Sequence, residues 1–93
     1  MKFSFVELDG NTFNGECSLI THDSLSENDP LKIAIKNSTA LSGVLGEFNF
    51  FKLTHSDQPI SASGFAVDNE NNVFHSDKLP DFVQIGTHWK VIE

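Results

Sequence analysis

Arginine and tyrosine are missing from this chain, and cysteine and tryptophan each occur once. Without arginine, the chain lacks the side chain that proteins use most for bidentate contacts to phosphate and guanine. Six lysines stand against thirteen acidic residues, which gives a formal net charge of −7. A surface of that sign repels polyanions. We therefore expect no binding to nucleic acid and, for the same reason, none to an anionic membrane surface.

The single cysteine, Cys17, excludes a disulfide within the chain. Small secreted domains commonly depend on such bridges, so a reducing compartment is expected. The N-terminal residues lack the apolar segment of a secretion signal, and no apolar run approaches the ~18 residues that a membrane-spanning helix needs. These features predict a cytoplasmic protein. Cys17 falls in a strand-like apolar pattern and is interpreted as a buried structural thiol.

Phenylalanine, in contrast, is abundant, with nine residues in a chain of 93. Its ring supplies apolar area without a polar tip and is suited to a dry core. The composition, 39% hydrophobic and 20% charged, is typical of a globular protein. Residues 1–93 are therefore expected to form a single compact β domain with a core rich in phenylalanine.

Alternation of apolar and polar residues predicts β-strands along most of the chain. Strands 2–8 and 12–20 flank Asp9-Gly10, a strong signal for a hairpin. Further strands are expected at 31–36, 44–54, 62–68 and 73–76, while 82–86 and 88–92 form either a tight hairpin or one bent strand. About seven strands with short connections predict a mainly β fold. The strands would form a single antiparallel sheet, strongly twisted or curled into a partial barrel or sandwich.

Residues 31–36 and 38–54 decide how much helix the fold contains. In 31–36, Leu31, Ile33 and Ile35 alternate with lysine and alanine, which favours a strand. Residues 38–54 contain a helical apolar stripe, but two glycines within it disfavour a long helix. At most one short helix is therefore expected, near 38–45, before the strand at 44–54. The adjacent pair Phe50-Phe51 predicts a β-bulge in that strand.

The tripeptide His-Ser-Asp occurs twice, at 55–57 and 75–77. Residues i and i+2 share a face in an extended chain, so the two segments together could supply four zinc or iron ligands. Ser and Asp are also common where a strand ends ahead of a proline-containing loop, and the tighter signatures of metal sites are absent. We expect no metal and no cofactor. The candidates, should a metal bind, are His55, Asp57, His75 and Asp77.

Acidic residues are concentrated in the predicted turns and loops. The longest acidic loop, 21–30, also contains Leu25, which is expected to be exposed and could anchor an apolar contact. Acidic loops on a small rigid sheet suit the capture of a basic protein, because complementary charge speeds association. The residues predicted to bind such a partner are Asp23, Leu25, Glu27, Asp29, Asp68 and Glu70.

No catalytic motif is found, and no enzymatic activity is expected. The leading hypothesis is a non-enzymatic binding protein, an acidic inhibitor of the immunity or antitoxin type that caps a basic partner such as a toxin nuclease. The alternative is a small β-barrel domain that binds a small ligand or metal near His55 and His75. A second alternative is a structural or assembly subunit that pairs through exposed sheet edges.

Overall fold

The computed structural model describes residues 1–38, 47–57, 64–75 and 82–92, which contain six strands and one α-helix. Between β2 and β3 lie a 3-10 turn, η1 (His22–Ser24), and the helix α1 (Pro30–Asn37). The strands are β1 (Lys2–Glu7), β2 (Thr12–Ile20), β3 (Asn49–Ser56), β4 (Gly64–Val67), β5 (Val73–His75) and β6 (Val83–Val91).

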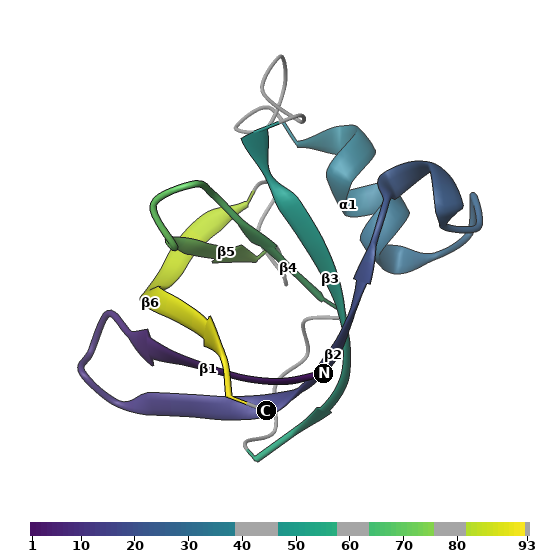
Figure 1. Ribbon diagram of the computed structural model, residues 1–93. Helices are drawn as coiled ribbons and strands as arrows, with labels where there is room; N and C mark the ends of the chain where they lie inside the picture. The colour runs from purple at the N-terminus through teal and green to yellow at the C-terminus, as the bar shows by residue number, and fades with distance from the viewer. Residues whose placement is uncertain (39–46, 58–63, 76–81, 93) are drawn as a thin grey trace.

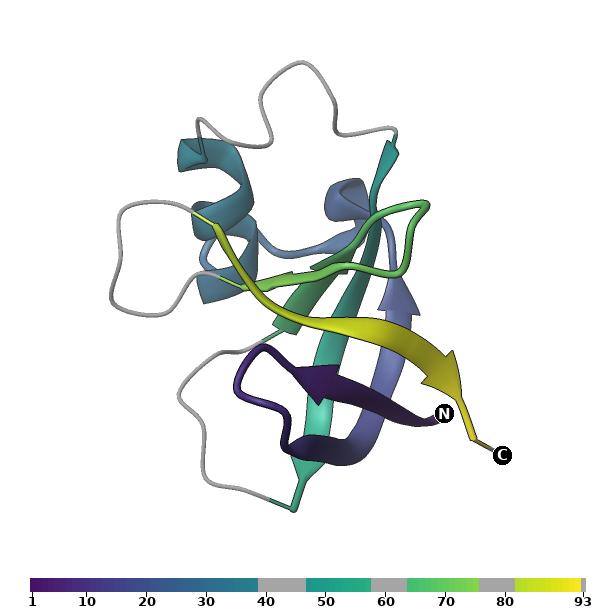
Figure 2. The ribbon, with the colours of Figure 1, turned by 90° about the vertical axis from the view of Figure 1, so that its left-hand side faces the viewer.

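The six strands form a closed antiparallel barrel (Figure 1). Each strand pairs with its neighbour in the sequence, and β6 returns to pair with β1. The predicted mainly β fold with a single antiparallel sheet is confirmed. The sheet closes fully on itself, so none of the six described strands has an open edge. Residues 83–91 form one bent strand rather than a hairpin. Figure 2 shows β6 curving across the barrel toward the paired ends of the chain.

The barrel is filled by stacked aromatic rings. Phe3 lies 4.7 Å from Trp89 between ring centroids, and Phe5 lies 4.9 Å from Phe13. The ring of Phe65 meets Phe3, Phe5 and Phe13 edge-on, which suits the quadrupoles of aromatic rings. We call this set the interior cluster; its buried members are Phe3, Phe5, Phe13, Cys17, Phe51, Phe65, Val67, Val73 and Trp89. The expectations of a phenylalanine core and a buried Cys17 are confirmed.

The helix lies outside the barrel, beside β3 (Figure 1). Leu31 and Ile35, one turn apart, are buried against Phe50 of β3 and Ala66 of β4. We call this the helix layer; its buried members are Leu31, Ile35, Phe50, Ala66 and Phe82. In the part of the chain that is described, no helix combines the length and apolar character needed to cross a bilayer.

The strand predicted at 31–36 is therefore wrong, because these residues are helical. Asp29 caps the helix: its carboxylate accepts a hydrogen bond from the Leu31 amide at 2.9 Å, and Pro30 occupies the first turn. Ile33, which an alternating strand would bury with Leu31 and Ile35, is 46% exposed. The helix predicted near 38–45 falls almost wholly on 39–46, outside the described residues, and the described helix ends at Asn37.

Strand β3 is buried on both of its faces at Phe50 and Phe51. Phe51 points into the interior cluster and its neighbour Phe50 into the helix layer, with regular pairing to Leu19 and Ile20. The bulge predicted at Phe50-Phe51 is wrong. An irregularity lies further along β3, where Glu16 pairs with His55 and Cys17 with Leu53. Two adjacent phenylalanines here reflect two apolar layers rather than a break in the ladder.

Candidate functional site

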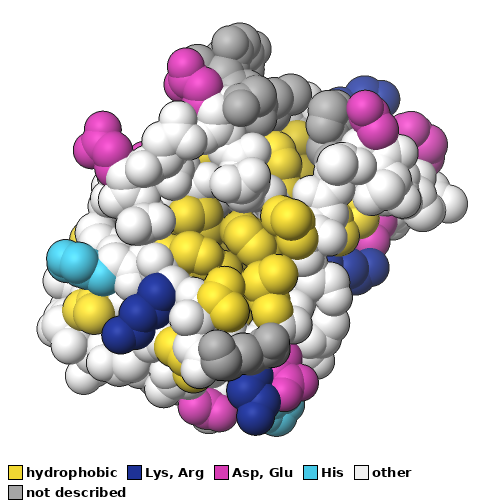
Figure 3. Space-filling view, in the orientation of Figure 1, with side chains coloured by type: hydrophobic (Ala, Val, Ile, Leu, Met, Phe, Trp, Pro, Cys, Tyr) yellow, Lys and Arg dark blue, Asp and Glu magenta, His cyan; other side chains and the backbone are white. Residues whose placement is uncertain are grey.

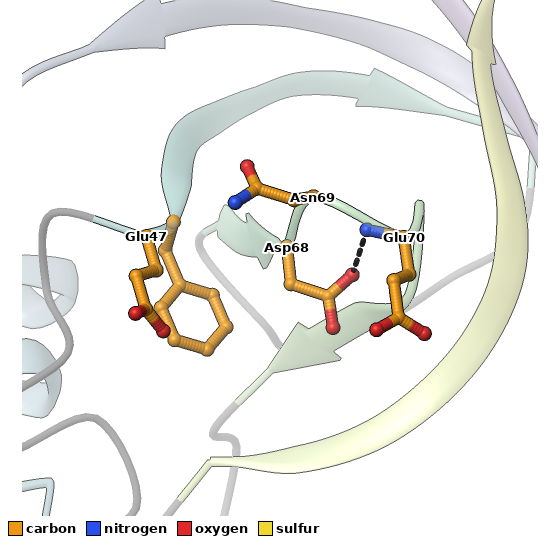
Figure 4. A pocket seen from close by; sticks show the side chains of 5 residues that line it. Glu47, Asp68, Asn69 and Glu70 are labelled. Atoms are coloured by element: carbon orange, nitrogen blue, oxygen red, sulfur yellow. Dashed lines mark hydrogen bonds between the residues drawn. The ribbon is translucent and has the colours of Figure 1, made fainter.

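A hollow of about 200 Å³ opens where the chain enters β3 and where β4 turns into β5. Its walls are Glu47, Phe48, Asp68, Asn69 and Glu70, and we call it the acidic hollow (Figure 4). Asn49 pairs with Val67, so residues just before β3 and just after β4 face one another across the ladder. Figure 4 shows Glu47 on one side, with Asp68, Asn69 and Glu70 opposite.

The β4–β5 turn is organised by Asp68. Its carboxylate accepts hydrogen bonds from the amides of Glu70 and Asn72, both at 2.9 Å, and from the Asn72 side chain at 3.0 Å. Partial burial raises the pKa of this carboxyl. The hydrogen bonds from Asn72 and from the Glu70 amide lower it by more in total, so the pKa of Asp68 lies below its usual value. Asp68 is therefore ionised at neutral pH, and it shapes the turn from which Glu70 projects.

Phe48 forms the apolar part of the hollow. It is half-buried and packs against the helix layer. Its ring meets Phe74 edge-on at 5.6 Å and lies 6.4 Å from Phe50 between centroids. These contacts fix the ring, so the hollow has a rigid aromatic wall next to two exposed carboxylates, those of Glu47 and Glu70.

Among the described residues that line the hollow, Glu47, Asp68 and Glu70 are acidic and none is basic. An ammonium or guanidinium group placed here would meet carboxylate acceptors and an aromatic wall together. Charge-assisted hydrogen bonds are the stronger class of hydrogen bond, and a cation over an aromatic face gains about 0.5–2 kcal/mol more. The chemistry of the hollow therefore suits the side chain of a lysine or arginine.

The other predicted partner-binding residues lie elsewhere. Asp23, in η1, and Glu27 are exposed on the connection between β2 and α1, on the opposite side of the barrel from the β4–β5 turn in Figure 1. Leu25, expected to be exposed, is half-buried against the helix layer. The six residues therefore do not form one surface.

Asp29 has a structural role in addition to its charge. It pairs with the Lys52 ammonium at 2.8 Å, with side-chain exposures of 11% for Asp29 and 48% for Lys52. The hydrogen bond from Lys52 and that from the Leu31 amide hold the pKa of the Asp29 carboxyl below its usual value, against a smaller opposing effect of burial. A partner would have to compete with Lys52 for this carboxylate.

The two histidine segments are not brought together. His55 is exposed near the end of β3, whereas His75 is half-buried in β5, with its ring 6.5 Å from that of Phe65. The strand register places His75 of β5 level with Phe65 of β4, which pairs with Phe51 of β3. His55 lies four residues further along β3 than Phe51. The two histidines are therefore separated by roughly 10 Å across the strands and roughly 13 Å along them. Asp57 is exposed, and Asp77 lies outside the described residues. Across residues 1–38, 47–57, 64–75 and 82–92, no three His, Cys, Asp or Glu side chains form a metal-binding group.

Sequence reasoning missed three residues of the acidic hollow: Glu47, Phe48 and Asn69. Glu47 and Phe48 fell inside the strand predicted at 44–54, whereas β3 begins at Asn49. Their position opposite the β4–β5 turn follows from the pairing of β3 with β4, which the sequence alone does not give.

Acidic side chains lie around the edge of one face of the molecule. Figure 3 shows apolar side chains in the middle of the face seen in Figure 1, with Asp and Glu side chains around its periphery.

The chain matches no family model, no curated protein and no solved structure at a significant level.

Proposed function

We propose that this protein is a non-enzymatic binding protein that captures a basic protein partner through the acidic hollow. One observation carries the proposal: the exposed carboxylates of Glu47 and Glu70 share a small hollow with the fixed ring of Phe48. A lysine or arginine side chain of the partner is the group that this combination suits, because it joins positive charge to an apolar stem.

A toxin nuclease is the kind of partner that the charge of the chain favours. A nuclease must attract a polyanion, so its active-site surface is basic. A protein of net charge −7 without arginine is attracted to the same surface and would cover it as an immunity or antitoxin-type inhibitor. The exposed acids Asp23 and Glu27, on the other side of the barrel, add to the long-range attraction but lie outside the proposed contact.

The test is a pull-down from the native host with two charge-matched double variants. Glu47→Gln with Glu70→Gln removes two carboxylates from the hollow, and Asp23→Asn with Glu27→Gln removes two elsewhere. We expect the first pair to weaken binding of the captured protein at least tenfold, and the second pair to reduce mainly the rate of association.

The captured protein is then purified and assayed for nuclease activity with and without this chain. Inhibition that is lost in the hollow variant supports the inhibitor role. Equal weakening by both double variants would show that only total charge matters, and the acidic hollow would be rejected as the contact. Failure of the wild-type chain to retain any basic protein would reject the proposed function.

A further inference from the structure

A second hollow, of about 440 Å³, lies over the seam where β6 closes onto β1. We call it the seam hollow. It is larger than the acidic hollow and falls within the range of roughly 300–1,000 Å³ that is usual for small-molecule sites. The residues of its wall that carry the argument are Ser4, Thr12, Asn71, His88, Trp89 and Lys90.

The backbone around the seam hollow is unusual in two places. Asn71 has a φ of 66° and His88 a φ of 61°, and these are the non-glycine residues with positive φ in the described part of the chain. Both belong to the wall of the same hollow. A histidine in the left-handed region is uncommon and costs energy that the surrounding structure must supply.

A β-bulge accounts for the conformation of His88. Ser4 pairs with Lys90, but Val6 pairs with Thr87, so β6 has one residue more than β1 across this interval. Bulges of this kind redirect side chains and are frequent beside functional sites. The Trp89 amide donates a hydrogen bond to the Asn71 carbonyl at 3.3 Å, which ties the bulge to the β4–β5 turn.

The wall of the seam hollow differs in character from that of the acidic hollow. His88 and Lys90 supply an imidazole and an ammonium, Ser4 and Thr12 supply hydroxyls, and none of the described residues of the wall is acidic. The Thr87 hydroxyl lies 2.7 Å from Nδ1 of His88. When that hydroxyl donates to Nδ1, the ring proton resides on Nε2, and Nε2–H can then donate to an anion.

The remaining wall is apolar and consists of the half-buried Val6 and the small outward-facing parts of Phe5 and Trp89, which are 1% and 9% exposed. Trp89 is fixed by its ring contacts with Phe3 and Phe51, both at 4.7 Å between centroids. We propose that the seam hollow binds a small organic anion with an apolar, planar body, an aromatic carboxylate. Lys90 and His88 hold the carboxylate, and the apolar wall contacts the ring.

The chain offers a direct readout, because Trp89 is its only tryptophan and it has no tyrosine. Fluorescence excited at the red edge of indole absorption therefore reports on one wall of the hollow. The probes are sodium benzoate, benzyl alcohol, which has the ring without the charge, sodium acetate, which has the charge without the ring, and inorganic phosphate. The Trp89 indole N–H resonance is followed in the same titrations.

We expect benzoate to shift both Trp89 signals with a dissociation constant on the order of 1 mM, which a ligand of so few atoms can reach. Lys90→Gln should weaken benzoate about tenfold and leave the weak binding of benzyl alcohol unchanged. Lys36→Gln, the same charge change on exposed Lys36 of α1, is the control and should have no effect. Glu47→Gln with Glu70→Gln should also leave benzoate binding intact, which separates this site from the acidic hollow.

The proposal is overturned if benzoate leaves both Trp89 signals unmoved, or if benzyl alcohol or acetate binds as tightly as benzoate does. Equal weakening by Lys36→Gln and Lys90→Gln would reduce the effect to general charge. Tighter binding of inorganic phosphate than of benzoate would show that the apolar wall plays no part.

Discussion

The interior cluster and the helix layer are both rich in phenylalanine, yet they are bounded differently. The interior cluster is enclosed by six strands whose hydrogen bonds close into a ring. The helix layer is covered by α1, an eight-residue helix. A cavity inside a closed wall cannot collapse easily, whereas a short helix can shift to fill a gap beneath it. The cost of losing a side chain should therefore depend on the side of the sheet from which it is removed.

Phe50 and Phe51 test this comparison most directly, because they are adjacent in β3 and are 4% and 6% exposed on opposite faces. Phe→Ala changes in a core cost about 3–5 kcal/mol. We expect Phe51→Ala to lie at the upper end of that range and Phe50→Ala at the lower end, in urea unfolding followed by circular dichroism. Equal losses, or a larger loss for Phe50→Ala, would contradict the distinction between the two regions.

Gly15 tests how tightly the wall of the interior cluster is built. A Cβ at this position would lie 2.4 Å from the His55 carbonyl oxygen and 3.1 Å from the Phe3 ring. Because the nearer atom belongs to the backbone of β3, the two strands must separate. Gly15→Ala should cost about 1–3 kcal/mol. The measurement is the urea midpoint, and an unchanged midpoint would show that the wall yields more readily than its packing indicates.

Asp29 provides the corresponding test for the helix layer. Asp29→Ala removes the cap of α1 and should cost about 1 kcal/mol. Asp29→Asn keeps a side-chain oxygen for the Leu31 amide and removes only the charge opposite Lys52, which is worth about 0–1 kcal/mol for so exposed a lysine. Native Trp89 fluorescence should be the same in both variants, because Trp89 belongs to the interior cluster and Asp29 caps the helix that covers the helix layer. A cost as large for Asn as for Ala would assign the effect to charge.

The pH dependence of stability gives the smallest expected difference. The pKa values of Asp29 and Asp68 lie below the ordinary value of 3.8 in the folded protein. Each therefore contributes stability that is fully present above the pKa of the unfolded chain and is lost as the pH falls through the lower, folded value. Below about pH 4 the free energy of unfolding should decline less steeply in Asp68→Asn and in Asp29→Asn than in the wild type, by less than about 1 kcal/mol in each variant. Urea midpoints measured across this pH range provide the comparison. A decline as steep as in the wild type would contradict these roles.

The sequence predicted the barrel better than the helix layer, and residues 29–36 show why. A single apolar alternation, Leu31, Ile33 and Ile35, fits a strand, but Leu31 and Ile35 are also four residues apart and share a helical face. Asp29-Pro30 immediately before them is a strong signal for the start of a helix. The helix-capping preference of that pair outweighs the strand preference of a three-residue alternation. The helix could have been predicted from the sequence on this ground.

The candidate sites could be predicted only in part. Asp68 and Glu70 were recognised as turn acids, but Glu47 joins them through the pairing of β3 with β4. The seam hollow had no signal in the sequence, since it depends on a bulge in β6 opposite β1. Residues that meet through strand register, rather than through spacing along the chain, are beyond single-sequence reasoning.

The pairing of β1 with β6 also sets the order in which the barrel can form. Phe3 pairs with Val91, and the Ile92 amide donates to the Lys2 carbonyl at 3.1 Å, so the ring of strands closes between segments far apart in the sequence. Closing so long a loop has a high entropic cost, and this cost arises before the contacts between β1 and β6 can offset it. The hairpin β1–β2 can form early, but it keeps an open edge until β6 arrives. During folding this edge is available to a wrong strand.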